Sequence, residues 1–310
     1  MAETFLVTGG AGFIGSHLCE ALLHRGAAVR VLDDLSTGKR TNLPPGIELI
    51  VGDVADPEAV RVAMDGAAGC FHLAAIASVP RGVTDWLGTH RTNLTGAIAV
   101  FDAARRQPAT IPVVYASSAA VYGACTVLPI EEATDARPLS AYGADKYGCE
   151  LHGRVASHVH GVPTVGLRFF NVYGPRQDPA SPYSGVISIF GDRITRGEPI
   201  AIHGDGQQTR DFVAVQDVVA ALLAAMTLRP ADAPVFNVCT GVPTSVLDLA
   251  QTIAELSGQT LTIEHQPARP GDIRHSLGSP TASRAALGLA EPVPLATGLA
   301  ATLDWLALSR

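Results

Sequence analysis

The sequence predicts an α/β protein built on a doubly wound parallel sheet, with a smaller α/β region at its C-terminal end. Strand and helix patterns alternate from Thr4 to Phe170, an order typical of a mostly parallel sheet covered by helices on both faces. Past Asn171 a loop rich in proline and polar residues leads into shorter segments. We therefore place a first region at residues 1–171 and a second at residues 172–310. The boundary is approximate, because we expect the chain to cross back.

Apolar periodicity defines the elements of the first region. Ile14, Leu18 and Leu22 recur at helical spacing after a glycine-rich turn, whereas short β-branched runs indicate strands. The predicted strands are residues 4–8, 28–32, 47–51, 69–73, 111–117 and 162–170. The predicted helices are residues 13–25, 57–64, 85–106 and 141–160.

The second region shows shorter elements of both kinds. Its predicted helices are residues 186–196, 218–226, 246–256, 280–288 and 295–308. Its predicted strands are residues 200–203, 235–239 and 261–265, with a further short segment over 211–215. This mixture predicts a small α/β region beside the main sheet.

Composition excludes several classes of protein. The chain has 310 residues, of which 47% are apolar and 16% charged, which excludes a disordered chain. A net charge of -7 without a basic stripe argues against a nucleic-acid partner. The longest apolar stretch, near residues 218–226, is too short to span a membrane, and the first residues lack an export signal. Five cysteines without a CxxC pair predict buried, reduced thiols and a cytoplasmic protein.

A GxxGxxG motif, formed by Gly9, Gly12 and Gly15, lies between the first strand and the first helix. Such a turn lets a pyrophosphate approach the backbone and the positive end of the helix. Asp33 ends the second strand, where a carboxylate accepts from an adenine-ribose hydroxyl pair and repels a 2′-phosphate, so NAD is favoured over NADP. Asp53 ends the third strand; it either accepts from the adenine amine or forms a turn before the next helix.

A YxxxK spacing, Tyr142 to Lys146, falls inside the predicted helix 141–160. Residues four apart share a helix face, so the phenol and the ammonium point into the same space. A nearby ammonium stabilises a phenolate, which makes a tyrosine usable as a base. Lys146 is one of only two lysines, the other being Lys39. Ser117 and Ser118 end the preceding strand, at the sheet edge where ligands collect in open α/β sheets.

These motifs together resemble the extended short-chain dehydrogenase/reductases that act on nucleotide sugars, and most closely the UDP-hexose 4-epimerases. The resemblance covers nearly the whole chain. The matching stretches are TGGAGFIGSHL, DDLSTGKR, GDVAD, HLAA, NLTG, YASSAAVYG, YGADK, RFFNVYGPRQ, GDGQQTRDFVAVQDV and RPGDIRHS. The fold that it implies is a Rossmann-type sheet with a nucleotide-sugar-binding region behind it.

The resemblance also implies roles for individual residues. The catalytic set is Ser118, Tyr142 and Lys146. The NAD-binding residues are Gly9, Gly12, Phe13, Ile14, Gly15, Asp33, Asp34, Ser36, Thr37, Gly38, Asp53, Val54, Leu73, Ala74, Ala75, Asn93, Ser117, Tyr142, Lys146 and Phe170. The UDP-sugar contacts are Ser118, Tyr142, Asn171, Arg210, Arg269, Asp272 and Ser276. A homodimer is expected through the helices 85–106 and 141–160. No metal site is expected, since His158 and His160 do not share a helix face.

The reaction is predicted from the residues that follow Ser118. Related dehydratases and decarboxylases carry acidic residues there, whereas this chain has Ala119 and Ala120. Of the reactions in the resembling family, we therefore predict epimerisation at C4 of the sugar through a transient 4-keto intermediate. The alternatives are a UDP-glucuronate 4-epimerase, a keto-sugar reductase that consumes NAD(P)H, and a sensor that binds NAD without catalysis.

The sequence leaves more than one sugar open as the substrate of this reaction. In the resembling epimerases, the position of Ser276 faces the C2 substituent, where a small residue admits 2-acetamido sugars. The sequence leaves UDP-glucose/UDP-galactose and the N-acetylated pair equally open. No arginine lies between Gln177 and Ile189, which argues mildly against an acidic sugar.

Overall fold

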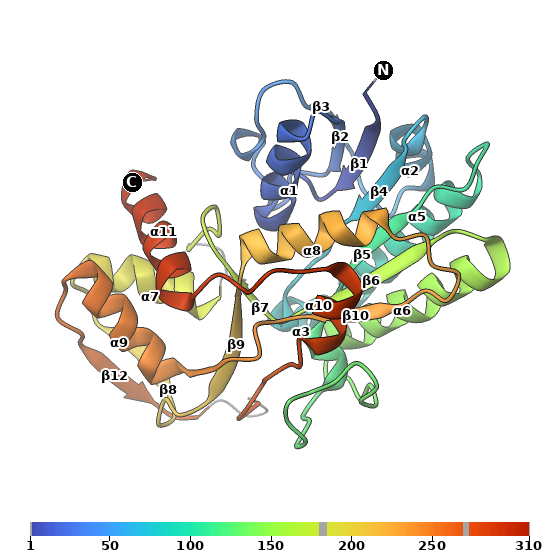
Figure 1. The fold of residues 1–310 in the computed structure, drawn as a ribbon. Coiled ribbons are helices and arrows are strands. Elements are labelled where there is room, and N and C mark those ends of the chain that lie inside the picture. The colour runs from blue at the N-terminus through green and yellow to red at the C-terminus, as the bar shows by residue number, and fades with distance from the viewer. Residues whose placement is uncertain (1, 180–184, 269–272, 310) are drawn as a thin grey trace.

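A seven-stranded parallel sheet forms the centre of the computed structural model, which describes residues 2–179, 185–268 and 273–309 (Figure 1). The strand order is β10-β6-β5-β4-β1-β2-β3, and every neighbouring pair is parallel. The strands are β1 (Thr4–Thr8), β2 (Ala28–Asp33), β3 (Glu48–Val51), β4 (Gly69–His72), β5 (Val113–Ser118), β6 (Thr164–Phe169) and β10 (Val235–Val238). The strand order reverses between β1 and β4, which confirms the predicted doubly wound sheet.

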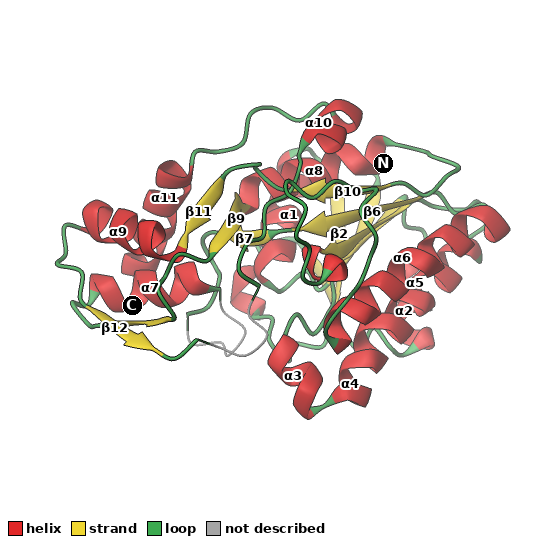
Figure 2. Cartoon of the chain, turned by 90° about the horizontal axis from the view of Figure 1, so that it is seen from below, coloured by secondary structure: helices red, strands yellow, loops and turns green. Residues whose placement is uncertain are grey.

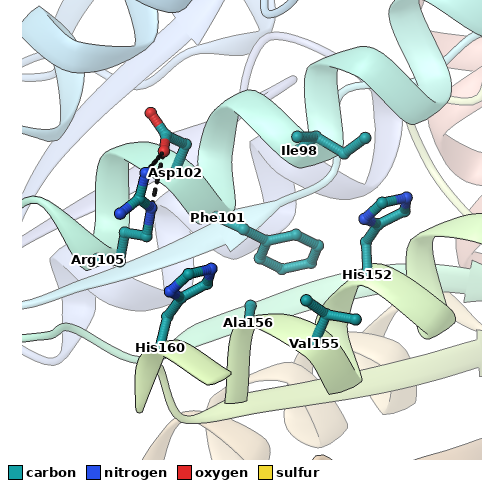
Figure 3. A pocket seen from close by; sticks show the side chains of 8 residues that line it. All are labelled: Ile98, Phe101, Asp102, Arg105, His152, Val155, Ala156 and His160. Atoms are coloured by element: carbon teal, nitrogen blue, oxygen red, sulfur yellow. Dashed lines mark hydrogen bonds and ion pairs between the residues drawn. The ribbon is translucent and has the colours of Figure 1, made fainter. Parts of the chain in front are cut away.

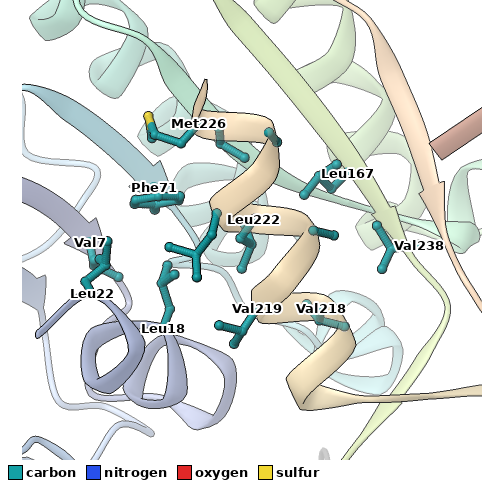
Figure 4. Packing of buried hydrophobic residues seen from close by; sticks show 14 of the residues in the cluster. Val7, Leu18, Leu22, Phe71, Leu167, Val218, Val219, Leu222, Met226 and Val238 are labelled. Atoms are coloured by element: carbon teal, nitrogen blue, oxygen red, sulfur yellow. The ribbon is translucent and has the colours of Figure 1, made fainter. Parts of the chain in front are cut away.

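Helices cover both faces of this sheet. One face carries α1 (Phe13–His24), α8 (Val215–Thr227) and α10 (Thr281–Leu287). The other carries α2 (Pro57–Met64), α5 (Gly96–Arg105) and α6 (Ala141–His160), which lie in one row in Figure 2. Figure 4 shows how Leu18 and Leu22 of α1 meet Val219 and Leu222 of α8 above the sheet. Both α8 and β10 come from the second half of the chain, so the chain crosses back onto the first region.

The second region has its own small sheets and core. A three-stranded sheet runs β11 (Pro243–Ser245), β9 (Thr209–Ala214), β7 (Asn171–Tyr173), and β8 (Ile200–His203) pairs with β12 (Ile263–Gln266). The helices α7 (Val186–Thr195), α9 (Val246–Ser257) and α11 (Leu295–Leu308) pack together around buried aliphatic side chains, among them Ile194, Leu249 and Leu299. This region is therefore α/β, as predicted.

The predicted helix 85–106 is the main difference from the sequence expectation. A π turn, Arg91–Thr95, separates α4 (Trp86–His90) from α5. Asn93 in this turn is fully buried; its Oδ1 accepts from Ile76 N at 2.8 Å and its Nδ2 donates to Ile76 O at 3.2 Å. The wider turn brings the amide to the segment after β4, and such insertions are frequent at functional sites. The structure also contains α3 (Val79–Thr84), β7 and β11, which were not predicted.

All five cysteines are free thiols, and four of the five predicted buried cysteines are buried, namely Cys19, Cys70, Cys149 and Cys239, whereas Cys125 is only half-buried. They lie on α1, on β4, on α6 and directly after β10, so they sample separate parts of the sheet and its helices. Within residues 2–179, 185–268 and 273–309, no helix combines the length and the apolar character that a membrane span requires.

Candidate active site

The glycine turn after β1 excludes a side chain at two of its three motif glycines and leaves a tight but less crowded place at the third. Gly9 has φ of +70°, and an added Cβ would lie 2.7 Å from Ala74 N. A Cβ at Gly15 would lie 2.2 Å from Gly9 O, so both glycines are required by backbone packing. A Cβ at Gly12 would meet, among the described residues, only Gly9 O, at 3.2 Å. Gly12 is the N-cap of α1 and brings no side chain that could cap the first-turn N–H groups.

Asp33 lies beside this turn, at the carboxyl end of β2. Its carboxylate accepts from Ala11 N and from Leu35 N, both at 2.9 Å. Burial raises the pKa of Asp33, and these two hydrogen bonds oppose that rise because they favour the ionised form. The next loop closes over Asp33: a Cβ at Gly38 would lie 2.8 Å from its Oδ1. Asp34 holds the same loop by accepting from the N–H and hydroxyl of Ser36.

The other predicted NAD-binding residues lie along the same edge of the sheet. Asp53 forms a turn by accepting from Ala55 N at 2.8 Å, and its second oxygen pairs with Arg91 at 2.9 Å. The turn bond is therefore present, Asp56 caps α2, and the adenine contact of Asp53 stays a prediction. Leu73, Ala74 and Ala75 directly follow β4, and buried Asn93 bonds to the adjoining Ile76.

The predicted catalytic residues converge where β5 ends. Lys146 is almost fully buried, donates to Ala116 O at 2.9 Å, and places its Nζ 5.9 Å from the Tyr142 ring centroid. Tyr142 is half-buried in the first turn of α6, which Ser140 caps by accepting from Gly143 N. Ser118 is half-buried as the last residue of β5, and its Oγ accepts from Ala120 N at 3.1 Å.

The first turn of α6 presses against the segment that follows Ser118. Ala119–Tyr122 forms a 3-10 turn, and an added Cβ at Gly143 would lie only 2.6 Å from Ala120 O. Tyr142 and Ser118 therefore flank one contact between helix and turn. The structure thus places the Tyr142 phenol and the Lys146 ammonium on one face of α6 and packs the first turn of that helix against the turn that follows Ser118.

Three of the predicted substrate residues lie at the continuation of the same edge. Ser118 pairs in register with Phe169 of β6, and Asn171 begins β7 two residues later. β7 pairs with β9, which carries Arg210, and Ser276 N donates to the neighbouring Thr209 O at 3.1 Å. Phe170, between β6 and β7, packs against Gly278 in the segment after Ser276. A Cβ added at Gly278 would lie 2.6 Å from the Phe170 ring. Arg269 and Asp272 lie outside the described residues.

Sequence reasoning missed a buried charged pair behind this edge. Glu150 and Arg168 bond to one another, and Ser117, predicted as an NAD contact, donates its hydroxyl to Glu150. Ser117 is almost fully buried, and its hydroxyl bonds to a partner inside the protein. The signal was an arginine inside the apolar run of residues 165–170, because a charge in a buried strand requires a partner.

Comparisons with known proteins agree with this geometry. Residues 5–239 match the model of the NAD dependent epimerase/dehydratase family. A UDP-glucose 4-epimerase of Mycolicibacterium smegmatis is 37% identical over 307 residues, covering 97% of each chain. The structure of a Thermotoga maritima UDP-glucose 4-epimerase with UDP-glucose has a TM-score of 0.94 at 35% identity, covering 99% of both chains. A UDP-N-acetylglucosamine 4-epimerase of Methanobrevibacter ruminantium M1, in complex with UDP-N-acetylmuramic acid, has a TM-score of 0.94 at 33% identity, covering 100% of both chains.

Proposed function

Because this chain belongs to the NAD dependent epimerase/dehydratase family, with NAD as its cofactor, we propose that it inverts C4 of a UDP-hexose through a transient 4-keto sugar. Family membership confirms the resemblance that the sequence motifs carried. The observation that supports the reaction is that Tyr142 and Lys146 share one face of α6, with Lys146 bonded to the end of β5 that carries Ser118. UDP-glucose and UDP-galactose are the expected substrate pair.

The glycine turn fits a dinucleotide. Gly12 has no side chain that would keep a pyrophosphate from the backbone, and the first-turn N–H groups of Phe13 and Ile14 would hold it at the positive end of α1. Asp33 would hold the adenine ribose from its buried place beside the turn. When bound, NAD would supply a reversible acceptor for the C4 hydride; inversion requires that the 4-keto sugar turn over in the site before the hydride returns.

The chain's own residues would move the proton and orient the sugar. Tyr142 would take the proton of the C4 hydroxyl and give it back. The buried Lys146 ammonium, held by Ala116 O, would stabilise the negative charge that develops on the reacting oxygen atoms during proton transfer. Ser118 would donate its hydroxyl hydrogen to the C4 oxygen, since its Oγ lone pair already accepts from Ala120 N. Ala119 and Ala120 carry methyl groups that cannot transfer protons, which disfavours dehydration and decarboxylation.

The experiment that tests this proposal is conversion of UDP-galactose to UDP-glucose by the purified protein without added NAD. We expect turnover with no net change in NADH absorbance and with NAD released on denaturation. Tyr142→Phe should lower the rate by about 10²–10⁴-fold, as for other acid–base groups. Tyr147→Phe makes the same chemical change five residues away and should keep the rate. Turnover by Tyr142→Phe at the wild-type rate would contradict the assignment.

The alternatives give different results in the same assay. A keto-sugar reductase would consume NAD(P)H in proportion to product, whereas the epimerase recycles its cofactor. A UDP-glucuronate 4-epimerase would prefer the acidic sugar, although no arginine between Gln177 and Ile189 offers it a partner. Acceptance of N-acetylated sugars is supported by Ser276, which is small, half-buried and tied to β9 beside Arg210.

We further propose that the enzyme is a homodimer. Apolar side chains remain exposed along the outer faces of α5 and α6, namely Ile98, Leu151, Val155 and Val159. Figure 3 shows the groove between these helices, in which Phe101 and Val155 are flanked by His152 and His160. Pairing α5 and α6 with a second copy would form a four-helix interface that covers this apolar surface. Because all five cysteines are free thiols, we place the enzyme in the cytoplasm.

A further inference from the structure

Glu150 and Arg168 form a buried ion pair that the proposed reaction does not use. The Glu150 carboxylate accepts from Arg168 Nε at 2.8 Å and from a terminal guanidinium nitrogen at 2.7 Å, so the pair is bidentate. Their side chains are only 5% and 8% exposed. A buried pair of this kind rarely adds stability over an apolar pair of the same volume, but its planar geometry fixes orientation closely.

The Glu150 end of the pair reaches the strand just before Ser118. Ser117 Oγ donates to Glu150 Oε1 at 2.5 Å, and Lys146 Nζ donates to Ala116 O at 2.9 Å. Tyr142, Lys146 and Glu150 are spaced four residues apart, so they form one stripe along α6. Two consecutive turns of α6 are therefore bonded to two consecutive residues of β5.

The Arg168 end of the pair reaches the turn just after Ser118. Arg168 donates to the hydroxyl of Tyr122 at 2.7 Å, and its guanidinium carbon lies 4.7 Å from the centre of the Tyr122 ring. Tyr122 in turn donates to Asn237 Oδ1 at 2.7 Å, which anchors it to β10. Tyr122 ends the 3-10 turn that starts directly after Ser118.

Ser118 thus lies between two anchors, Ser117 and Tyr122, and both are bonded to the same ion pair. We infer that Glu150 and Arg168 are positioning residues that set the placement of the Ser118 hydroxyl relative to the Tyr142 phenol. This inference rests on the proposed C4 epimerisation. The pair touches neither reacting group; it holds the segment carrying Ser118 and the helix carrying Tyr142 in one arrangement. A displacement of about 1 Å in such a site costs on the order of 10²-fold in rate.

The test replaces the pair while keeping the core filled. Glu150→Met combined with Arg168→Met removes both charges and retains similar volume, so the protein should fold and keep its NAD. We expect kcat for UDP-galactose to fall about 10- to 100-fold with KM changed less than threefold. Arg168→Lys keeps the charge but not the bidentate fork, and it should also lose kcat. Wild-type kcat in the Met pair would overturn the inference, as would full activity of Arg168→Lys.

A matched control and a structural readout complete the test. Arg30 and Glu48 form an ion pair between β2 and β3, away from the carboxyl ends of these strands, and its replacement by two methionines should leave kcat unchanged. A crystal structure of the Glu150→Met/Arg168→Met variant with NAD should show the Ser118 Oγ to Tyr142 OH distance shifted by about 0.5 Å or more. An unshifted distance would overturn the inference. If wild type epimerises no UDP-hexose, the proposed function fails, and this distance alone decides the positioning role.

Discussion

Gly12→Ala should weaken NAD binding while leaving the stability of the NAD-free protein nearly unchanged. Gly12 has φ of -78° and ψ of -176°, which alanine adopts without strain, and the added methyl would meet only Gly9 O at 3.2 Å among the described residues. We expect the free energy of unfolding of the NAD-free protein to change by no more than about 1 kcal/mol. The methyl would instead occupy the place that we propose for the pyrophosphate. A clash of about 1–3 kcal/mol corresponds to roughly 5- to 150-fold weaker NAD binding.

Gly15→Ala is the matched comparison in the same turn. Its Cβ would lie 2.2 Å from Gly9 O and 2.7 Å from Gly10 Cα, so the backbone itself must move. This change should destabilise even the NAD-free protein by about 1–3 kcal/mol or more. Thermal unfolding of both variants without NAD measures the stability of the NAD-free protein. The increase in unfolding temperature on addition of NAD measures how strongly each variant binds the cofactor. If Gly12→Ala gains as much thermal stability from NAD as wild type does, the pyrophosphate does not lie at Gly12.

Three further substitutions test the other parts of the site. Asp33→Ala should weaken NAD binding and relieve the penalty on NADP, measured as the ratio of the two dissociation constants; an unchanged ratio would refute the role of its charge. Ser276→Tyr should abolish turnover of UDP-N-acetylgalactosamine and spare UDP-galactose in competition kinetics, and a wild type that accepts no N-acetylated sugar would contradict the premise. Val155→Asp should give a monomer in sedimentation at micromolar concentration, whereas Val242→Asp, an exposed valine of the second region, should not. A wild-type monomer would refute the dimer.

Features set by local spacing could be predicted from the sequence. Tyr142 and Lys146 lie on one face of α6 because helical geometry fixes positions four apart, and Ser118 ends β5 where the apolar run ends. The seven strands were predicted for the same reason, although their order in the sheet needed the structure. Strands of three residues, such as β7, are too short to show alternation.

Features set by distant partners could not be predicted. The π turn at Arg91–Thr95 depends on Asn93 finding Ile76, a contact that no spacing within the helix reveals. Arg168 was visible as a charge in a buried strand, but its partners come from α6, the turn after β5 and the backbone of Glu132. Glu150 repeats the four-residue interval of Tyr142 and Lys146, so its alignment with the site could have been noticed.

The four buried cysteines are natural probes of local opening of the structure. Burial raises the pKa of Cys19 to about 12 and that of Cys149 to about 11, and it also raises the pKa values of Cys70 and Cys239. Thiolates are the form that reacts with alkylating reagents, so these thiols are protected while the fold is closed. The labelling rate of each cysteine then measures how often the structure around that cysteine opens. Cys149 lies beside Glu150, so its labelling would follow the docking of α6 without any engineered probe.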